Sequence, residues 1–400
     1  MSPGPPPGTD PSRPCRVGGA PPGSERRILG TATTRRHSRG PAHPAPRRLP
    51  GGRRRRPPRT RPGLGALKPL ARAEGLPGVA ALAMDRRGTA YAACSGGGSD
   101  GSGPRAVALS LDPAGAVAQG AARELPASAC FVALGPDGRS LFSASYGDGR
   151  LDRVPLPGAD GAAPARYETG ANTHCVAFSP DGRFVYATSL GDDRVSWFES
   201  GGEAEPGADD GAIAPSGHVA AEPGSGPRYL RLNAIGDRAY VVHELTGEVA
   251  VYGRDAESGA LELLQRVSAV EGLGLVPGPV RSASTPDPGT GVVWAADLRL
   301  TPDGRFLFTT ERSTSTISAF AVKDDGTLEF LARTATETQP CGSAIDPSGR
   351  FLLVCGEGSD HISSYWIGDD GSLTPASRAE TSAGPLAIEC WSAQAGAPVL

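Results

Sequence analysis

The stretch Thr301-Pro302-Asp303-Gly304-Arg305-Phe306-Leu307-Phe308-Thr309-Thr310 leads into Thr316-Ile317-Ser318-Ala319-Phe320-Ala321-Val322 and then Asp324-Asp325-Gly326. Short runs with alternating apolar residues are separated by turn residues, which is typical of a meander of strands. Proline at the first turn presets φ and glycine accepts a positive φ, while Asp-Gly at the second favours a hairpin. The unit begins again at Asp346-Pro347-Ser348-Gly349-Arg350. A repeated meander of this size is typical of a β-propeller blade.

Turn cues of the same kind recur along the chain at blade-sized intervals. There are six, at 85–88, 136–139, 180–183, 234–237, 302–305 and 347–350. A second and a third strand are predicted after each cue, as at Phe184–Thr188 and Arg194–Phe198, whereas the signal for a fourth strand is weaker. No amphipathic helix is predicted. The fold class is therefore all-β, a β-propeller.

The number of blades depends on the two ends of the repeat. Gly384–Trp391 has the pattern of one more first strand, without a second and third of its own. Gly65–Arg72 is the candidate for an outer strand of the same blade, because propellers usually close with strands from both ends of the chain. We therefore predict a seven-bladed β-propeller over residues 64–395, with six complete blades and an incomplete seventh.

Residues 1–63 consist largely of proline, glycine and arginine, with Asp10 and Glu25 as the only acidic residues. Such a segment buries too little apolar surface to offset its ordering entropy, so it is predicted to be a disordered arm. Arg53-Arg54-Arg55-Arg56 is either a polyanion-binding patch or an inert tail. No aromatic residue is interleaved for base stacking, so we predict no nucleic-acid partner. A further hypothesis is that a shifted reading frame in GC-rich DNA produced this segment.

The remaining composition restricts the class of protein. The net charge is −3, and the seven cysteines include no C-x-x-C pair, so no zinc or redox motif is predicted. An odd number of scattered cysteines favours reduced thiols and a cytoplasmic location. No apolar run approaches the roughly 20 residues that span a bilayer, so no membrane association is expected.

Several segments resemble the seven-bladed propeller family of bacterial 6-phosphogluconolactonases. They are Trp294-Ala295-Ala296-Asp297 before the turn at 302–305, Thr336–Pro340, His361–Tyr365, Gly226-Pro227-Arg228 with Glu244-Leu245, and His174 with Asp193-Arg194. The resemblance covers roughly residues 64–395, which is most of the chain. It implies hydrolysis of 6-phospho-D-glucono-1,5-lactone in the pentose phosphate pathway, without metal or organic cofactor.

Opening a lactone ring needs an activated water and a cationic or N–H group for the developing oxyanion, and a phosphorylated substrate needs further positive charge. The resemblance points to Arg228 and Arg312 for the cationic groups, since guanidinium pairs bidentately with phosphate. The alternative for Arg228 is a surface arginine that caps a turn. Glu244 is either the general base or the partner that positions Arg228.

Three more residues complete the predicted site. His174 has a reference pKa suited to proton transfer, although a histidine at a strand start can equally be a plain hydrogen-bonding residue. Asp297 is assigned to substrate binding and could instead orient an arginine. Tyr229 stands where the family has histidine after Pro-Arg, and is assigned to the substrate-binding set.

Other departures from the family affect substrate choice. Cys341 replaces an arginine, Arg299 replaces a histidine, and Glu357 stands where glutamine is usual. Loss of the cation at position 341 weakens the case for a phosphorylated substrate. Two alternatives stay open, namely a lactonase or lactonising enzyme for another lactone, and a non-catalytic propeller that binds a partner. In an enzyme, the predicted residues must meet at one mouth of the channel.

Overall fold

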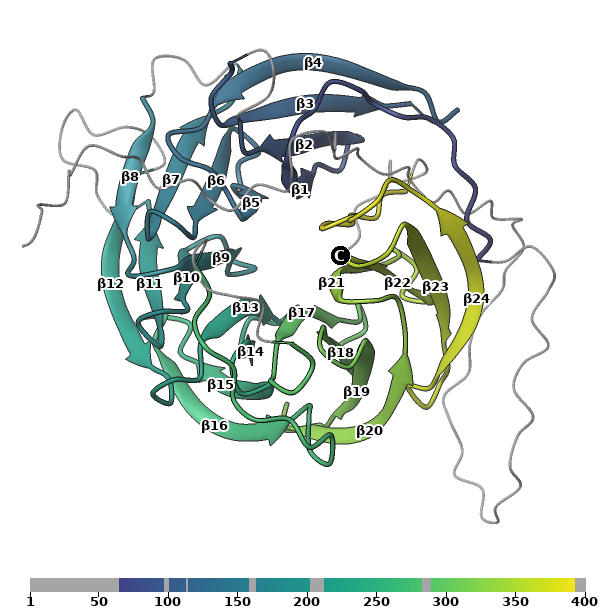
Figure 1. Ribbon diagram of the computed structural model, residues 1–400. Coiled ribbons are helices and arrows are strands. Elements are labelled where there is room, and N and C mark those ends of the chain that lie inside the picture. Colours follow the sequence, from purple (N-terminus) through teal and green to yellow (C-terminus); the bar gives the residue numbers. More distant parts are fainter. Residues whose placement is uncertain are drawn as a thin grey trace, which may run out of the picture.

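The computed structural model describes residues 65–96, 101–112, 114–157, 163–201, 212–282 and 289–392 of the 400-residue chain. Over these residues, twenty-four strands form six four-stranded sheets and no segment is helical. The sheets are arranged radially around a central axis, as the blades of a propeller (Figure 1). The prediction of an all-β propeller is confirmed.

Each blade is an antiparallel meander of four consecutive strands. The strands of blades one and two are β1 (Val79–Met84), β2 (Thr89–Cys94), β3 (Arg105–Leu111), β4 (Val117–Glu124), β5 (Phe131–Leu134), β6 (Ser140–Ser145), β7 (Arg150–Pro155) and β8 (Ala165–Glu168). Those of blades three and four are β9 (Thr173–Phe178), β10 (Phe184–Ser189), β11 (Arg194–Ser200), β12 (Ile213–Ala220), β13 (Pro227–Leu232), β14 (Arg238–His243), β15 (Glu248–Arg254) and β16 (Leu261–Ser268). Those of blades five and six are β17 (Ala295–Leu300), β18 (Phe306–Glu311), β19 (Thr316–Val322), β20 (Leu328–Ala335), β21 (Pro340–Ile345), β22 (Phe351–Gly356), β23 (His361–Ile367) and β24 (Leu373–Glu380).

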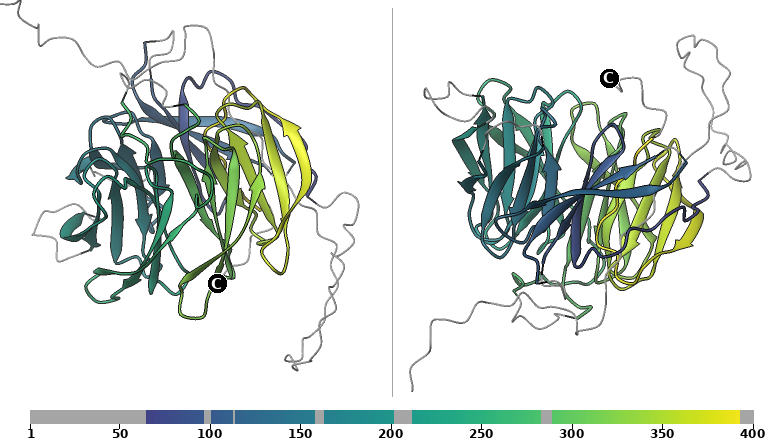
Figure 2. Two further views of the ribbon diagram at one scale, coloured as in Figure 1. Left: turned by 60° about the horizontal axis from the view of Figure 1, so that its bottom comes forward. Right: turned by 90° about the horizontal axis from the view of Figure 1, so that it is seen from above.

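The first strand of every blade lies nearest the axis and the fourth lies at the rim (Figure 1). All six predicted turn cues connect a first strand to a second, so that prediction is confirmed. The second strands are almost wholly buried, whereas the fourth strands alternate between exposed and covered residues. Side views show that the strand ends gather at two opposite faces of the ring (Figure 2). The ends of the first strands therefore surround the central axis at each face, and each end of the axis is called a mouth.

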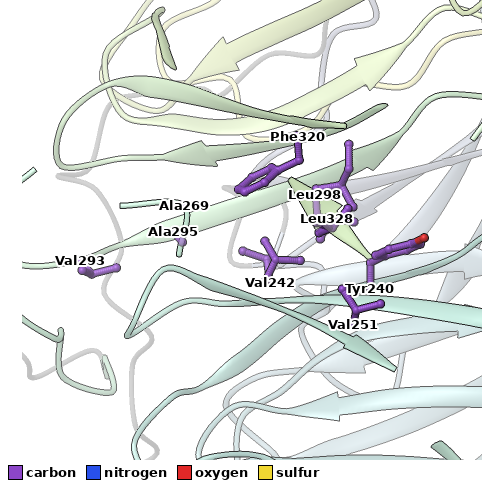
Figure 3. Packing of buried hydrophobic residues seen from close by; sticks show 11 residues of the cluster. Tyr240, Val242, Val251, Ala269, Val293, Ala295, Leu298, Phe320 and Leu328 are labelled. Carbon is purple, nitrogen blue, oxygen red and sulfur yellow. The ribbon is translucent and has the colours of Figure 1, made fainter. Parts of the chain in front are cut away.

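Blades are held together by apolar clusters between facing sheets. The interface of blades four and five is an example, in which Tyr240, Val242 and Val251 of one sheet pack against Leu298 and Phe320 of the next (Figure 3). Equivalent clusters join blades one to two, two to three, three to four and five to six. Burial of these side chains supplies the main driving force for closing the ring.

The prediction of six complete blades is confirmed, whereas the strands predicted for an incomplete seventh blade do not form in the described residues. Neither Gly384–Trp391 nor Gly65–Arg72 forms a strand. The C-terminal segment nevertheless lies against β21, where a side chain at Gly342 would meet the Leu386 carbonyl oxygen at 2.6 Å. A strand needs a neighbour that pairs with its backbone, and the described residues offer none to this segment.

Two irregular segments cover the facing sides of blades six and one in place of a blade. Ile388 and Leu67 pack on blade six, and Ala73 and Leu76 pack on blade one. Hydrogen bonds fix the same segments, from the Leu67 N–H to Ser377 Oγ (3.1 Å) and from Gln119 Nε2 to the Glu74 carbonyl (2.6 Å). The apolar faces that a seventh blade would cover are thereby shielded from water.

We expect Ile388→Ala to lower the free energy of unfolding by about 2–5 kcal/mol, because the side chain is 5% exposed and seals blade six. Ile235→Ala is the matched control, since Ile235 is 82% exposed, and its effect should stay within about 0.5 kcal/mol. Urea denaturation measures both. Equal effects of the two substitutions would show that the C-terminal segment does not act as part of the fold.

Candidate active site

An irregularity at the start of the innermost strands places side chains at one axial mouth. Pairing with the second strand shifts register between Thr173 and Cys175, between Pro227 and Tyr229, and between Pro340 and Gly342. The residues that these shifts leave without a partner on the second strand are His174, Arg228 and Cys341, respectively. A β-bulge of this kind re-aims a side chain and is common at barrel rims and beside active sites.

The residue before each of these strands has a left-handed backbone. The φ values are 55° at Asn172, 66° at Gly226 and 52° at Gln339. At position 226 the conformation and the space both require glycine, because a Cβ would meet Leu245 Cγ at 2.7 Å. Gly226-Pro227-Arg228 and Gln339-Pro340-Cys341 share this geometry. In both, a residue with positive φ is followed by a proline and then by the bulged residue.

A second ring of side chains comes from the residues directly after the second strands. Glu244, Arg312 and Glu357 occupy this position in blades four, five and six, and Tyr146 occupies it in blade two. Their backbones are held alike, since the N–H of Glu244 donates to Gly226, that of Arg312 to Trp294 and that of Glu357 to Gln339. Because the first strands begin where the second strands end, both rings lie at the same mouth.

The centre of the site is a buried ion-pair cluster of two arginines and one carboxylate. Glu244 Oε2 accepts from Arg228 Nε (2.7 Å) and lies 2.8 Å from Arg312 Nη2. Further donors go to backbone carbonyls, from Arg228 Nη1 to Ala296 and from Arg312 Nε to Trp294. All three charged side chains are about 5% exposed. Burial favours the neutral carboxyl, but Arg312 and Arg228 outweigh it and lower the pKa of Glu244 to about 2.

His174 lies beside this cluster in an aromatic setting. Its ring makes edge contacts with Tyr146 and Tyr229, with centroids 5.7 and 5.4 Å away, and Nδ1 is 4.0 Å from Cys130 Sγ. Burial and the charge of Arg228 lower the pKa of His174 to about 3. The imidazole is therefore neutral at neutral pH. Tyr229 also stacks under Arg228, whose Cζ lies 4.4 Å from the ring centroid.

Asp297 is fully buried and joins neighbouring innermost strands. Its Oδ2 accepts from the N–H and the hydroxyl of Ser343 on β21, at 2.7 and 2.9 Å, and pairs with Arg299 Nε at 3.2 Å. It thus orients an arginine, but the arginine is Arg299. Its assignment to substrate binding stays a prediction, as do the roles of the other five residues.

Three residues of the mouth were not predicted from the sequence. Trp294 stacks on Arg312, with Cζ 3.9 Å from the ring centroid, and Arg281 contacts the same indole at 3.8 Å. Tyr146 donates to the carbonyl of Arg281 at 2.7 Å. Tyr146 could have been found from its position, because it follows a second strand as Glu244 does. Arg281 lies in an inter-blade segment whose course the strand pattern does not reveal.

Among the residues that the structure describes, no group of three or more His, Cys, Asp or Glu side chains is arranged to hold a metal ion. The expectation that the reaction needs no metal or cofactor stays a prediction. In the described ranges no helix is long and apolar enough to cross a membrane. The six cysteines in these ranges are all free thiols.

The described residues define a β-propeller with a buried arginine–carboxylate cluster at one end of its central axis. Residues 59–390 match the family described as Lactonase, 7-bladed beta-propeller, and the chain belongs to this family. The family description has seven blades, whereas the described residues form six complete ones. The resemblance seen in the sequence is confirmed.

Individual relatives are named as lactonases. The chain is 33% identical to the 6-phosphogluconolactonase of Pectobacterium carotovorum over 246 residues, which are 60% of this chain and 68% of that protein. It is 31% identical to the 6-phosphogluconolactonase of Pectobacterium atrosepticum, with the same coverage. Among solved structures, the periplasmic gluconolactonase of Pseudomonas aeruginosa superimposes with a TM-score of 0.66 at 27% identity, covering 80% of this chain and 89% of that one.

We expect Glu244→Gln to lower the free energy of unfolding by about 3–5 kcal/mol, because it leaves two buried guanidinium groups without a counter-charge. Glu199→Gln is the matched control. Glu199 is 45% exposed and 3.6 Å from Arg183, so its effect should be below about 1 kcal/mol. Denaturant unfolding at neutral pH compares them, and similar losses in both variants would argue against a buried ion-pair cluster.

Buried histidines should make the fold sensitive to mild acid. His243 on β14 is 2% exposed, neither ring nitrogen has a hydrogen-bond partner in the described residues, and burial lowers its pKa to about 4. An unfolded histidine titrates near pH 6.5, so between about pH 6.5 and 4 the unfolded state binds a proton that the folded state excludes. Stability therefore falls as the pH decreases through this window, by up to about 1.4 kcal/mol per pH unit for each such histidine.

His243→Leu should make this pH dependence of the free energy of unfolding shallower. The matched control is His218→Leu, at an exposed position on β12, which should leave the slope as it is. Urea titrations at pH 7.0, 6.0 and 5.0 provide the measurement. The explanation fails if the His243 variant retains the full slope.

Proposed function

We propose that this enzyme hydrolyses 6-phospho-D-glucono-1,5-lactone to 6-phosphogluconate, a reaction of the pentose phosphate pathway. The single observation that carries the proposal is the convergence of Arg228, Arg312, Glu244 and His174 at one axial mouth. Membership of the lactonase family and relatives that bear the 6-phosphogluconolactonase name support it. Scatter of these residues over the ring would instead have favoured a non-catalytic binding propeller.

In the proposed mechanism the two arginines bind the lactone carbonyl and the oxyanion that forms from it. Nη2 of Arg228 and Nη1 of Arg312 donate to no described residue, so they remain available to a ligand oxygen. Glu244 fixes both guanidinium groups in place before substrate arrives. Such preorganised donors act strongly because the surroundings exclude water and need not reorganise during the reaction.

His174 is the proposed general base, since its imidazole is neutral and can accept a proton from water. The water oxygen attacks the carbonyl carbon, the ring C–O bond breaks, and the imidazolium returns its proton to the leaving alkoxide. The charge of Arg228 lowers the pKa of His174 in the free enzyme. An oxyanion that forms on Arg228 offsets that charge, so the imidazole becomes more basic as the reaction proceeds.

One observation favours a second candidate, hydrolysis of an unphosphorylated sugar lactone. Cys341 stands at a bulged position equivalent to that of Arg228, and its thiol supplies no cation for a phosphate. Burial raises the pKa of Cys341, against the opposing charges of Arg228 and Arg312, so the thiol stays neutral. The Pseudomonas structure described as a gluconolactonase belongs to a protein similar to this chain.

We expect the purified protein to hydrolyse 6-phosphogluconolactone faster than the spontaneous reaction, and Arg312→Lys to lower kcat/KM about 100- to 1000-fold, because ammonium cannot reproduce the guanidinium fork. An assay coupled to oxidation of the product measures this, with glucono-1,5-lactone as the parallel substrate. Arg333→Lys is the control, because Arg333 lies on β20 at the rim of blade five and donates to the carbonyl of Ala269, which follows β16 of blade four. If neither lactone is hydrolysed above background, the lactonase proposal is wrong.

Several predictions about the whole protein remain predictions. The predicted disordered arm, residues 1–63, and its boundary with the propeller at residue 64 lie outside the described residues, which begin at Gly65. We propose a cytoplasmic enzyme that acts on a small-molecule lactone. The expectation of no nucleic-acid partner is likewise untested.

A further inference from the structure

A segment between β16 and β17 crosses the mouth of the candidate active site. It leaves blade four at Ala269 and is fixed by backbone hydrogen bonds from the Gly278 N–H to Leu245 (2.8 Å) and from the Val293 N–H to Val276 (2.8 Å). At its far end the carbonyl of Arg281 accepts from the hydroxyl of Tyr146 in blade two at 2.7 Å. We call residues 276–281 the strap, because they bridge blades four and two.

The strap carries Arg281 into the mouth. The Cζ atom of Arg281 is 3.8 Å from the ring centroid of Trp294, and Arg312 Cζ is 3.9 Å from the same centroid. The indole is 8% exposed and therefore gives both guanidinium groups a dry surface on which to stack. Tyr146, which holds the strap, also contacts the ring of His174. Arg281 is thus positioned beside the proposed catalytic groups.

Three arginines lie at this mouth, Arg228, Arg312 and Arg281, against the two carboxylates Glu244 and Glu357. Arg228 and Arg312 share one carboxylate, Glu244, and their other contacts go to backbone carbonyls. Within the described ranges no carboxylate lies within ion-pair distance of Arg281, whose side chain is only half-buried. The indole Nε1–H of Trp294 is buried and also lacks a hydrogen-bond partner there. An unopposed cation next to an unused donor is the environment that a bound oxyanion would complete.

We propose that Arg281 on the strap is the phosphate-binding residue that selects a phosphorylated lactone, with Trp294 as its platform. The inference rests on the proposed function, because it assigns the substrate's second charged group to that same site. Arg228 and Arg312 hold the carbonyl end, and Arg281 binds the phosphate end through its planar fork. The strap thereby supplies the cation that Cys341 does not.

The test compares Arg281→Ala with the matched control Arg350→Ala. Arg350 also stacks on a tryptophan, 4.3 Å from the Trp366 ring centroid, but its turn lies between β21 and β22 at the opposite face of the ring. The ratio of kcat/KM for 6-phosphogluconolactone to that for glucono-1,5-lactone should fall about 10- to 100-fold in the Arg281 variant and stay unchanged in the control. The change should lie mainly in KM, because the phosphate is remote from the reacting bond.

Binding measurements separate this inference from the proposed function. Isothermal titration of the wild-type chain with 6-phosphogluconate and with gluconate reports the contribution of the phosphate without any turnover. If neither lactone is hydrolysed but the preference for 6-phosphogluconate disappears in the Arg281 variant alone, the proposed reaction is wrong and the phosphate site stands. An unchanged ratio and an unchanged binding preference in that variant would overturn the inference. Equal loss with phosphorylated and unphosphorylated ligands would overturn it as well, because it would assign Arg281 a structural role.

Discussion

The candidate active site depends on one local distortion, the β-bulge at the start of the innermost strands. A regular strand alternates its side chains between the two faces of a sheet, and both faces of a blade pack against neighbouring blades. The side chain of the extra residue in a bulge does not follow this alternation, so it does not have to pack in the apolar clusters between blades. In blades three, four and six these residues are His174, Arg228 and Cys341. The fold can therefore vary its chemistry at these positions without repacking its core.

A buried carboxylate is what makes two neighbouring guanidinium groups tolerable at this mouth. Arg228 and Arg312 come from different blades, and they would repel each other in a poorly solvated site. Glu244 lies between them and accepts from one while it pairs with the other. The carbonyls of Ala296 and Trp294 take further N–H groups. The cluster thus fixes the relative position of blades four and five.

The turn chemistry made most of the fold predictable from the sequence. Each cue such as 302–305 contains a glycine with positive φ, and each connects a first strand to a second. The fourth strands were weaker in the sequence because they lie at the rim, where exposed residues obscure the alternation, and β12 was hidden within a stretch rich in glycine and proline. The six complete blades were predicted correctly, but the strands assigned to an incomplete seventh blade were wrong. The pattern of Gly384–Trp391 reflects burial against β21, and burial alone does not supply the paired backbone of a strand.

For the site, the sequence identified residues that are fixed by local geometry and missed those fixed by distant contacts. Arg228 lies at the start of a strand that Gly226-Pro227 marks, and Glu244 directly follows the next strand, so their meeting could be expected. The approach of Arg281 to Trp294 depends on a hydrogen bond to Tyr146, which is 135 residues earlier in the chain. No periodicity encodes such a contact. In the proposed enzyme, substrate selection is therefore separable from the chemistry, because the strands position the proposed reacting groups while an inter-blade segment carries the proposed phosphate-binding charge.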